Sequence, residues 1–197
     1  MVSQIKVNEI IKQSGSSITI GESGDTINIG TTGDTINLAG AAYAAVDNTP
    51  AFGASQSGTQ TLSTGSWSKV TLDTENWDTD SAFDNSTNYR FTVPSGEGGK
   101  YLFNYGGYCV SMTTNGYFQL SLYKNGSELR ASTNRSYMSS TATASMNITS
   151  SICVSLDAAD YIEFYVIQGN TDGGGGDRTL GDSNYKAFLT GFKVIGA

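Results

Sequence analysis

The chain has 197 residues, of which 38% are hydrophobic and 15% charged, with a formal net charge of −7 and no histidine. No basic run is present to neutralise phosphates, which argues against nucleic acid and anionic lipid as partners. Without histidine the chain lacks the commonest general base near neutral pH and the commonest zinc ligand, so we expect no catalytic residue, metal or cofactor. The 24 glycines and 11 tyrosines, with only 2 prolines, favour strands and tight turns and therefore an all-β fold. No stretch is long and apolar enough to predict membrane insertion.

Residues 1–15 form the first predicted segment, a leader with apolar residues among polar neighbours. Those residues are Ile5, Val7, Ile10 and Ile11. The leader has no uninterrupted apolar region and no small-residue cleavage site, so we expect no Sec export. Two interpretations of the leader stay open. It is either a tail that docks on another protein or a short strand or helix that begins the next segment.

Three nine-residue units follow, at 16–24, 25–33 and 34–42, and each contains an apolar pair at the same two positions. The pairs are Ile18 and Ile20, Ile27 and Ile29, and Ile36 and Leu38. Residues two apart on a strand lie on the same face, but one pair per unit cannot enclose a core within a single chain. Three chains wound about one axis would bring the pairs of all three into each layer. The repeat therefore predicts a trimeric β-helical stalk over 16–46.

A stretch of small residues that ends at Pro50 marks the boundary to a third predicted segment, 47–197. Its short runs of alternating apolar and polar residues predict a two-sheet sandwich or jelly roll. We expect strands near 51–56, 59–63, 67–74, 89–94, 99–112, 116–124, 143–156, 160–168 and 185–195. Turn residues support this division, most clearly Asn125-Gly126. Cys109 and Cys153 lie in apolar strand-like runs, and we expect two buried reduced thiols rather than a disulfide.

The densest group of carboxylates lies in one predicted loop and comprises Asp73, Glu75, Asp78, Asp80 and Asp84. These oxygens could bind Ca²⁺, but the spacing of an EF-hand is missing, and solvated loop carboxylates are the favoured interpretation. Trp67 and Trp77 could stack on sugars. Packing in the core, or a cap on the sandwich edge, is favoured for both.

The segment 169–184 contains four consecutive glycines and is predicted to be a loop. Its candidate receptor-contacting residues are Asn170, Asp172, Asp177, Arg178 and Asp182. No Gly-Lys-Ser/Thr follows the glycines, so the segment is not a phosphate loop. A contact with a receptor and a solvated linker between two strands remain as alternatives, and the linker is favoured.

Short motifs in the third segment occur in a distinctive order. They are Pro50-Ala51-Phe52 and Ala54, Val70 to Asp73, Trp77, Phe83-Asp84, Tyr89 to Pro94, Gly99 to Phe103, Leu122 to Gly126, Leu156, Asp160 to Ile162, and Phe188 to Phe192. This order resembles the C1q-like domain, the trimeric jelly roll related to the tumour-necrosis-factor fold. The resemblance implies a homotrimeric jelly-roll head. One departure is Lys186-Ala187 before Phe188, where the family usually has Ser or Thr, and the pairing of the final strand should survive it.

The N-terminal run at 2–21, with SGDTINIG at 23–30, is similar to the opening of structural proteins from bacteriophages, particularly marine ones. This similarity implies a non-enzymatic virion protein, assembled in the host cytoplasm as a homotrimeric head fibre, decoration protein or tail-fibre component. Residues 1–15 would anchor it to a capsid or tail protein, and the tip is a candidate for contact with a host-surface glycan or protein. One alternative is a carbohydrate-binding C1q-like module of a bacterial surface protein. A weaker one is a glycoside hydrolase that uses paired carboxylates.

Overall fold

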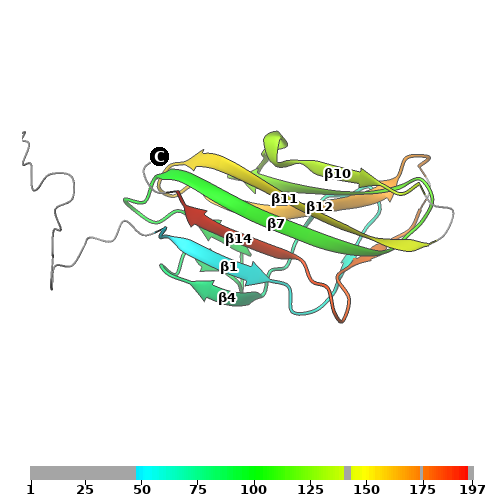
Figure 1. The fold of residues 1–197 in the computed structure, drawn as a ribbon, viewed down its shortest axis with the longest axis horizontal. Coiled ribbons are helices and arrows are strands. Elements are labelled where there is room, and N and C mark those ends of the chain that lie inside the picture. Colours follow the sequence, from blue (N-terminus) through cyan, green and yellow to red (C-terminus); the bar gives the residue numbers. More distant parts are fainter. Residues whose placement is uncertain (1–47, 140–142, 174, 195–197) are drawn as a thin grey trace, which may run out of the picture. The chain divides into compact units, whose positions relative to one another are not determined.

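The computed structural model describes residues 48–139, 143–173 and 175–194. Two antiparallel sheets, here called sheet A and sheet B, stack face to face, and the hydrophobic core lies between them (Figure 1). The all-β sandwich predicted for the third segment is therefore confirmed.

The two N-terminal predictions fall on residues outside the described ranges. One is the leader with its proposed anchor residues Ile5, Val7, Ile10 and Ile11. The other is the β-helical stalk, with its six proposed core residues Ile18, Ile20, Ile27, Ile29, Ile36 and Leu38. No described residue supports the stalk, so the anchor and the stalk both stay predictions.

Sheet A contains seven strands. They are β1 (Ala51–Ser55), β2 (Gln60–Leu62), β4 (Thr74–Asp78), β7 (Gly99–Met112), β11 (Ala144–Leu156), β13 (Arg178–Leu180) and β14 (Phe188–Lys193). The long strand β7 pairs with β11 on one side, and with β14 and then β13 on the other. β1 lies between β14 and β4, as the front layer of Figure 1 shows.

Sheet B also contains seven strands. They are β3 (Ser68–Lys69), β5 (Phe83–Asp84), β6 (Arg90–Thr92), β8 (Gly116–Lys124), β9 (Ser127–Glu128), β10 (Asn134–Tyr137) and β12 (Tyr161–Asn170), and a 3₁₀ turn, Arg130–Ser132, precedes β10. β12 pairs with β8 on one side and with β6 and β3 on the other. β10 runs along the free side of β8 and is an edge strand of the sheet.

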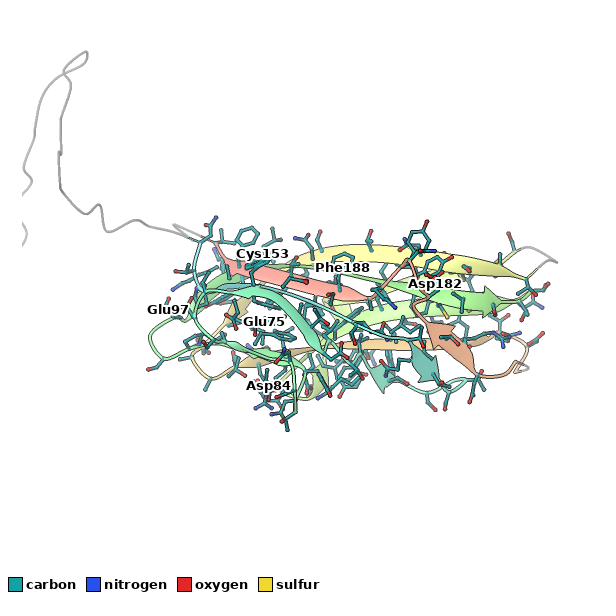
Figure 2. All side chains as sticks on the ribbon, turned by 90° about the horizontal axis from the view of Figure 1, so that it is seen from below. Glu75, Asp84, Glu97, Cys153, Asp182 and Phe188 are labelled. Carbon is teal, nitrogen blue, oxygen red and sulfur yellow. The ribbon has the colours of Figure 1, made fainter. Side chains whose placement is uncertain are left out.

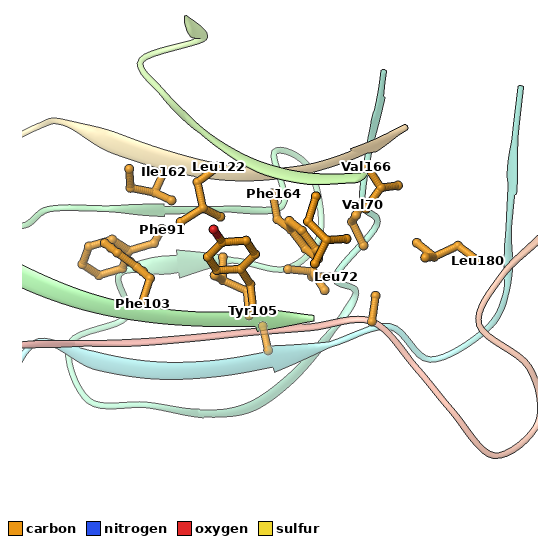
Figure 3. Close-up of a cluster of buried hydrophobic side chains, with 14 of the residues drawn as sticks. Val70, Leu72, Phe91, Phe103, Tyr105, Leu122, Ile162, Phe164, Val166 and Leu180 are labelled. Atoms are coloured by element: carbon orange, nitrogen blue, oxygen red, sulfur yellow. The ribbon is translucent and has the colours of Figure 1, made fainter. Parts of the chain in front are cut away.

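Aromatic rings from both sheets fill one end of the core (Figure 3). Phe52 of β1 stacks on Phe91 of β6 with ring centroids 4.8 Å apart, and on Phe83 of β5 at 4.9 Å. Phe103 of β7 meets Phe91 edge to face. Each of these rings occupies an inward position of its strand, because side chains alternate between the two faces of a sheet. Burial of these rings holds the two sheets together.

The hairpin turn predicted at Asn125-Gly126 is confirmed. Both residues have positive φ, 53° and 77°, which is the backbone of a type I′ turn and suits the twist of the flanking strands. The strands expected near 99–112, 116–124 and 143–156 are also present, as β7, β8 and β11. Long runs with clear alternation were thus located well.

Two expected elements were wrong in their extent. The single strand near 67–74 is instead β3 followed by β4, because Val70 and Leu72 are both buried where the chain crosses from one sheet to the other. The expected loop 169–184 contains the strand β13, whose Leu180 is fully buried. The short strands β5, β9 and β10 were also not predicted, since two to four residues carry too little periodicity.

The expectation for the cysteines was half wrong. Both thiols are free, and Cys109 is buried as expected, but Cys153 is exposed. On β11 the neighbours Ile152 and Val154 take the inward positions, so Cys153 points out of the sheet. Burial raises the pKa of the Cys109 thiol to about 12, which makes this thiol unreactive in the folded chain.

Candidate functional site

The outward side of sheet A is one candidate surface. The residues that alternate with the buried Phe52, Tyr101, Phe103, Tyr105 and Leu189 must point away from the core. These outward residues form what we call the outer face of sheet A: Ala51, Gly53 and Ser55 on β1; Phe188, Thr190 and Phe192 on β14; Lys100, Leu102, Asn104, Gly106 and Tyr108 on β7; and Asn147, Thr149, Ser151, Cys153 and Ser155 on β11. Lys100 is the one charged residue among these positions.

An apolar row crosses this face. Phe192 pairs with Ala51 on one side and with Leu102 on the other, and Leu102 in turn pairs with Cys153. Phe188 lies further along the same strand, and Figure 2 shows it on the same long side of the domain as Cys153. The phenylalanines and Leu102 are partly exposed. A nearly uncharged sheet face that carries a row of partly exposed apolar side chains is suited to a protein contact.

Two glycines allow large rings to lie flat on this face. A Cβ on Gly106 would stand 2.6 Å from the ring of Phe188, and one on Gly53 would stand 2.6 Å from the indole of Trp77. Real Cβ atoms do not approach so closely, so a side chain at either position would force the neighbouring ring to move. Trp77 remains 47% exposed. It caps the edge of the sheet on strand β4, one of the two favoured interpretations of this residue.

Most of the predicted receptor residues gather at one end of the domain. The side-chain amide of Asn170 donates to the carbonyl of Thr114 at 3.2 Å, and Arg178 Nη2 donates to Thr113 Oγ1 at 3.1 Å. Asp172 accepts a hydrogen bond of 3.3 Å from the side chain of Asn115. These three therefore surround the turn between β7 and β8.

The side chains of the other two predicted receptor residues make hydrogen bonds elsewhere. Asp177 accepts a hydrogen bond of 3.4 Å from the backbone N–H of Thr64. Asp182 caps a separate turn by accepting from the backbone N–H groups of Asn184 and Tyr185, both at 2.7 Å. The five residues thus do not form one cluster, and their contact with a receptor stays a prediction.

Carboxylates of the acidic segment 73–84 accept hydrogen bonds from nearby backbone N–H groups. Asp84 accepts hydrogen bonds from the backbone N–H groups of Thr87 and Ser86, and these bonds hold the pKa of that carboxyl well below its usual range. Asp78 likewise accepts a bond of 2.7 Å from the backbone N–H of Phe83. Within the three described ranges, no three Cys, Asp or Glu side chains are grouped so that they could hold a metal ion.

Reasoning from the sequence missed the outer face of sheet A as a unit. The signal was present in the final strand, where Phe188 and Phe192 lie on the face of the strand opposite to the buried Leu189. A strand with large apolar residues on both of its faces is covered on both sides, either within the chain or by a partner.

In the described part of the chain no helix is long and apolar enough to cross a membrane.

No protein-family model matches the chain, and no curated protein sequence matches it. Solved structures do match. The globular domain of zebrafish complement 1qA protein is 17% identical with a TM-score of 0.51, over 74% of this chain and 98% of that one. The Eiger TNF structure from S. frugiperda is 16% identical with a TM-score of 0.51, over 75% and 93% of the two chains.

The described domain therefore has the jelly-roll fold seen in these C1q and TNF structures. PRD1 vertex protein P5 also matches, with 18% identity over 73% of this chain and 96% of that one, but its TM-score of 0.48 is too low to support an argument. At these identities the matches establish the fold alone. The jelly roll confirms the architecture that the order of motifs implied for residues 50–197.

Proposed function

We propose that the protein is a homotrimeric, non-enzymatic structural component of a bacteriophage virion, a head fibre, decoration protein or tail-fibre component. In this proposal residues 1–15 attach to a capsid or tail protein, residues 16–46 form the stalk, and the jelly roll is the exposed head. The similarity of the N-terminal run to phage structural proteins supports the virion role. The jelly-roll fold and the nonapeptide repeat both support the trimer.

The outer face of sheet A carries the trimer proposal. In a single chain it leaves Phe188, Phe192 and Leu102 partly in water, with Trp77 47% exposed beside them. Three copies that pack these faces around one axis would cover them. The nearly uncharged face would then enter a contact without the large penalty of desolvating charges.

The test of assembly is native mass spectrometry of the full chain, which has a mass of 20.8 kDa. We expect a species of three times that mass at micromolar concentration. A clean monomer would contradict both the stalk and the face contact.

The test of attachment is deletion of residues 1–15. The truncated chain should remain a folded, soluble trimer, yet virions assembled with it should lack the protein. Mass spectrometry of the trimer provides the control for folding. Normal occupancy of particles by the truncated chain would place the attachment site elsewhere, most simply in the jelly roll.

The alternative function, a carbohydrate-binding module of a bacterial surface protein, also has a specific observation in its favour. Tyrosines occupy outward positions along the two central strands of sheet B. Flat aromatic rings are suitable platforms for sugars. A sugar-binding head would serve either function.

A further inference from the structure

The outward side of sheet B is rich in tyrosine. Tyr117 and Tyr123 occupy outward positions of β8, and Tyr161 and Tyr165 occupy outward positions of β12. Most of these rings are covered by one another or by a neighbouring side chain. Tyr123 packs on Tyr165 with centroids 4.1 Å apart, for example, and Trp67 meets Tyr123 edge-on at 5.9 Å.

One end of this face is different because it leaves a ring and a cation open. Tyr137, on the edge strand β10, is 57% exposed. Arg135, two residues earlier on the same strand, is also exposed, and its guanidinium carbon lies 4.6 Å above the ring of Tyr117. Its Nη1 donates a hydrogen bond of 3.1 Å to the hydroxyl of Tyr137. The cation and the open ring are therefore held side by side.

The position of Arg135 is fixed by its surroundings. Its Nε donates to the side-chain oxygen of Gln119, which is only 6% exposed. Tyr117 lies against Gly169 so closely that a Cβ there would stand 2.7 Å from the tyrosine hydroxyl. The guanidinium thus lies on a packed ring and is hydrogen bonded to a buried amide. Because it is already ordered, less conformational entropy is lost when a ligand binds.

Arg135 has no carboxylate partner within the described ranges. Three lysines in the described ranges form ion pairs, with Glu163, Asp160 and Glu97, but no described carboxylate pairs with this arginine. Its Nη2 also has no hydrogen-bond partner among the described residues. An acidic chain of net charge −7 thus presents at its surface a guanidinium that no described carboxylate neutralises. The second hydrogen of Nη1 and both hydrogens of Nη2 remain for a ligand carboxylate, which forms charge-assisted hydrogen bonds with a guanidinium.

We infer that Arg135 and Tyr137 form a binding site for an acidic sugar, a pyranose that carries a carboxylate, such as a uronic or sialic acid at the end of a surface glycan. The C–H face of the sugar ring packs on Tyr137, and its carboxylate pairs with Arg135. One exposed ring beside one cation matches a single sugar residue. An acidic peptide presents several carboxylates, whereas this pair of residues offers one cation, so its charge is matched better by a sugar with a single carboxylate.

Arg135 and Tyr137 lie on the outward side of sheet B, so the site faces away from the outer face of sheet A, which neighbouring chains would cover. Strand β10 is nevertheless next to β11 of sheet A, where the side-chain amide of Asn134 donates to the carbonyl of Thr149 at 3.0 Å. Tyr117 pairs with Gly169 near the β7–β8 turn, at the end of the domain opposite to the start of β1 and the end of β14 (Figure 1). The inference deepens the proposed function, on which it rests, by naming the ligand class of the head.

The test measures binding of two acidic probes, trigalacturonate and sialyllactose, to the full chain by calorimetry. Methyl-esterified trigalacturonate and lactose are the uncharged counterparts. We expect at least one acidic probe to bind at least about tenfold more tightly than its counterpart. Arg135→Gln and Tyr137→Ala should each weaken that binding at least about tenfold, whereas Tyr137→Phe, which keeps the ring, should change it less than about threefold.

Arg90→Gln is the matched control. Arg90 lies 4.2 Å above the ring of Tyr161 on the same sheet, so it makes the same kind of contact, but no ring as exposed as Tyr137 accompanies it. This variant should bind like the unmodified protein, and melting temperatures should show that all variants are folded. Binding by neither acidic probe up to about 10 mM would overturn the inference.

Two further outcomes separate the alternatives. If hexaglutamate binds as tightly as the better sugar and Tyr137→Ala leaves the binding of both unchanged, the site is a general anion site and the sugar inference is wrong. A monomeric chain that still binds the acidic sugar through Arg135 would overturn the trimer and leave this inference standing. A trimer in which Arg135→Gln has no effect on sugar binding would overturn this inference and leave the trimer standing.

Discussion

The replacement Leu102→Asp tests the contact proposed for the outer face of sheet A. Leu102 lies in the middle of the apolar row, between Phe192 and Cys153. In a single chain its side chain is partly exposed, so an aspartate there should be tolerated by the isolated jelly roll. In a trimer closed by this face, the same aspartate would be buried against another chain.

The expected effect on assembly is several kcal/mol per subunit. Burying the exposed 47% of Trp77 removes roughly 100 Å² of surface from water and contributes about 2.5 kcal/mol. Leu102, Phe188 and Phe192 are already partly covered, and each contributes about 1 kcal/mol. Aspartate at position 102 removes one such contribution and adds the cost of desolvating a carboxylate, which is several kcal/mol unless it is paired. The change therefore offsets most of the favourable burial on this face.

Cys153 reports the outcome directly because it pairs with Leu102 and is exposed in the single chain. We expect a thiol reagent to modify Cys153 at least about tenfold more slowly in the native protein than in Leu102→Asp, even if the stalk still holds three chains together. Cys109, buried and with its pKa raised to about 12, should react only after unfolding. Thr92→Asp adds the same charge to sheet B and should leave Cys153 protected. Equal reaction rates in the native protein and Leu102→Asp would refute the face contact.

Two further predictions concern the stability of the head. Lys69 pairs at 2.5 Å with Glu163, which is only 6% exposed, so Lys69→Met should lower the free energy of unfolding in urea by about 2 kcal/mol. Lys193→Met loses a pair with Glu97, whose side chain is 39% exposed, and should cost less than about 1 kcal/mol. Equal losses would contradict the role of burial. Hydrogen bonds from Lys124 and Asn125 lower the pKa of Asp160 to about 2 from 3.8, so its stabilisation is present above pH 4 and lost as the pH falls towards 2. Asp160→Asn should therefore cost about 1 kcal/mol at pH 7 after allowance for solvent screening and should flatten the loss of stability between pH 4 and pH 2; an unchanged acid profile would count against this assignment.

The strands that the sequence located best are long and strictly alternating. β7, β8 and β11 each extend over nine or more residues, so the period of two repeats often enough to be unmistakable. β13 contains three residues and lies between loop segments. Only its pairing with β2 and β7 makes it a strand. No local pattern specifies such a partner, because that partner lies elsewhere in the chain.

The predicted receptor residues illustrate a different limit. Glycine content predicted a loop over 169–184, and residues 171–173 and 175–177 do lie outside strands, but it did not predict where they would pack. The structure brings Asn170, Asp172 and Arg178 around the β7–β8 turn and leaves Asp182 in another turn. Such groupings depend on sheet register, and a change of one residue in register would move every side chain to the other face.

The two outward faces show why function was harder to predict than fold. In β14 and β12 the residues that point into the sandwich are apolar, as any sandwich requires, and their spacing predicts the strand. The residues that point outward are under no such requirement, so their composition depends on what lies outside the sheet. Phe188 and Phe192 make the outward positions of β14 apolar, whereas tyrosines at 161 and 165 make those of β12 aromatic and polar. Reading the inward and outward positions separately would have distinguished a face suited to a second copy of the chain from one suited to a ligand that offers hydroxyls and charge.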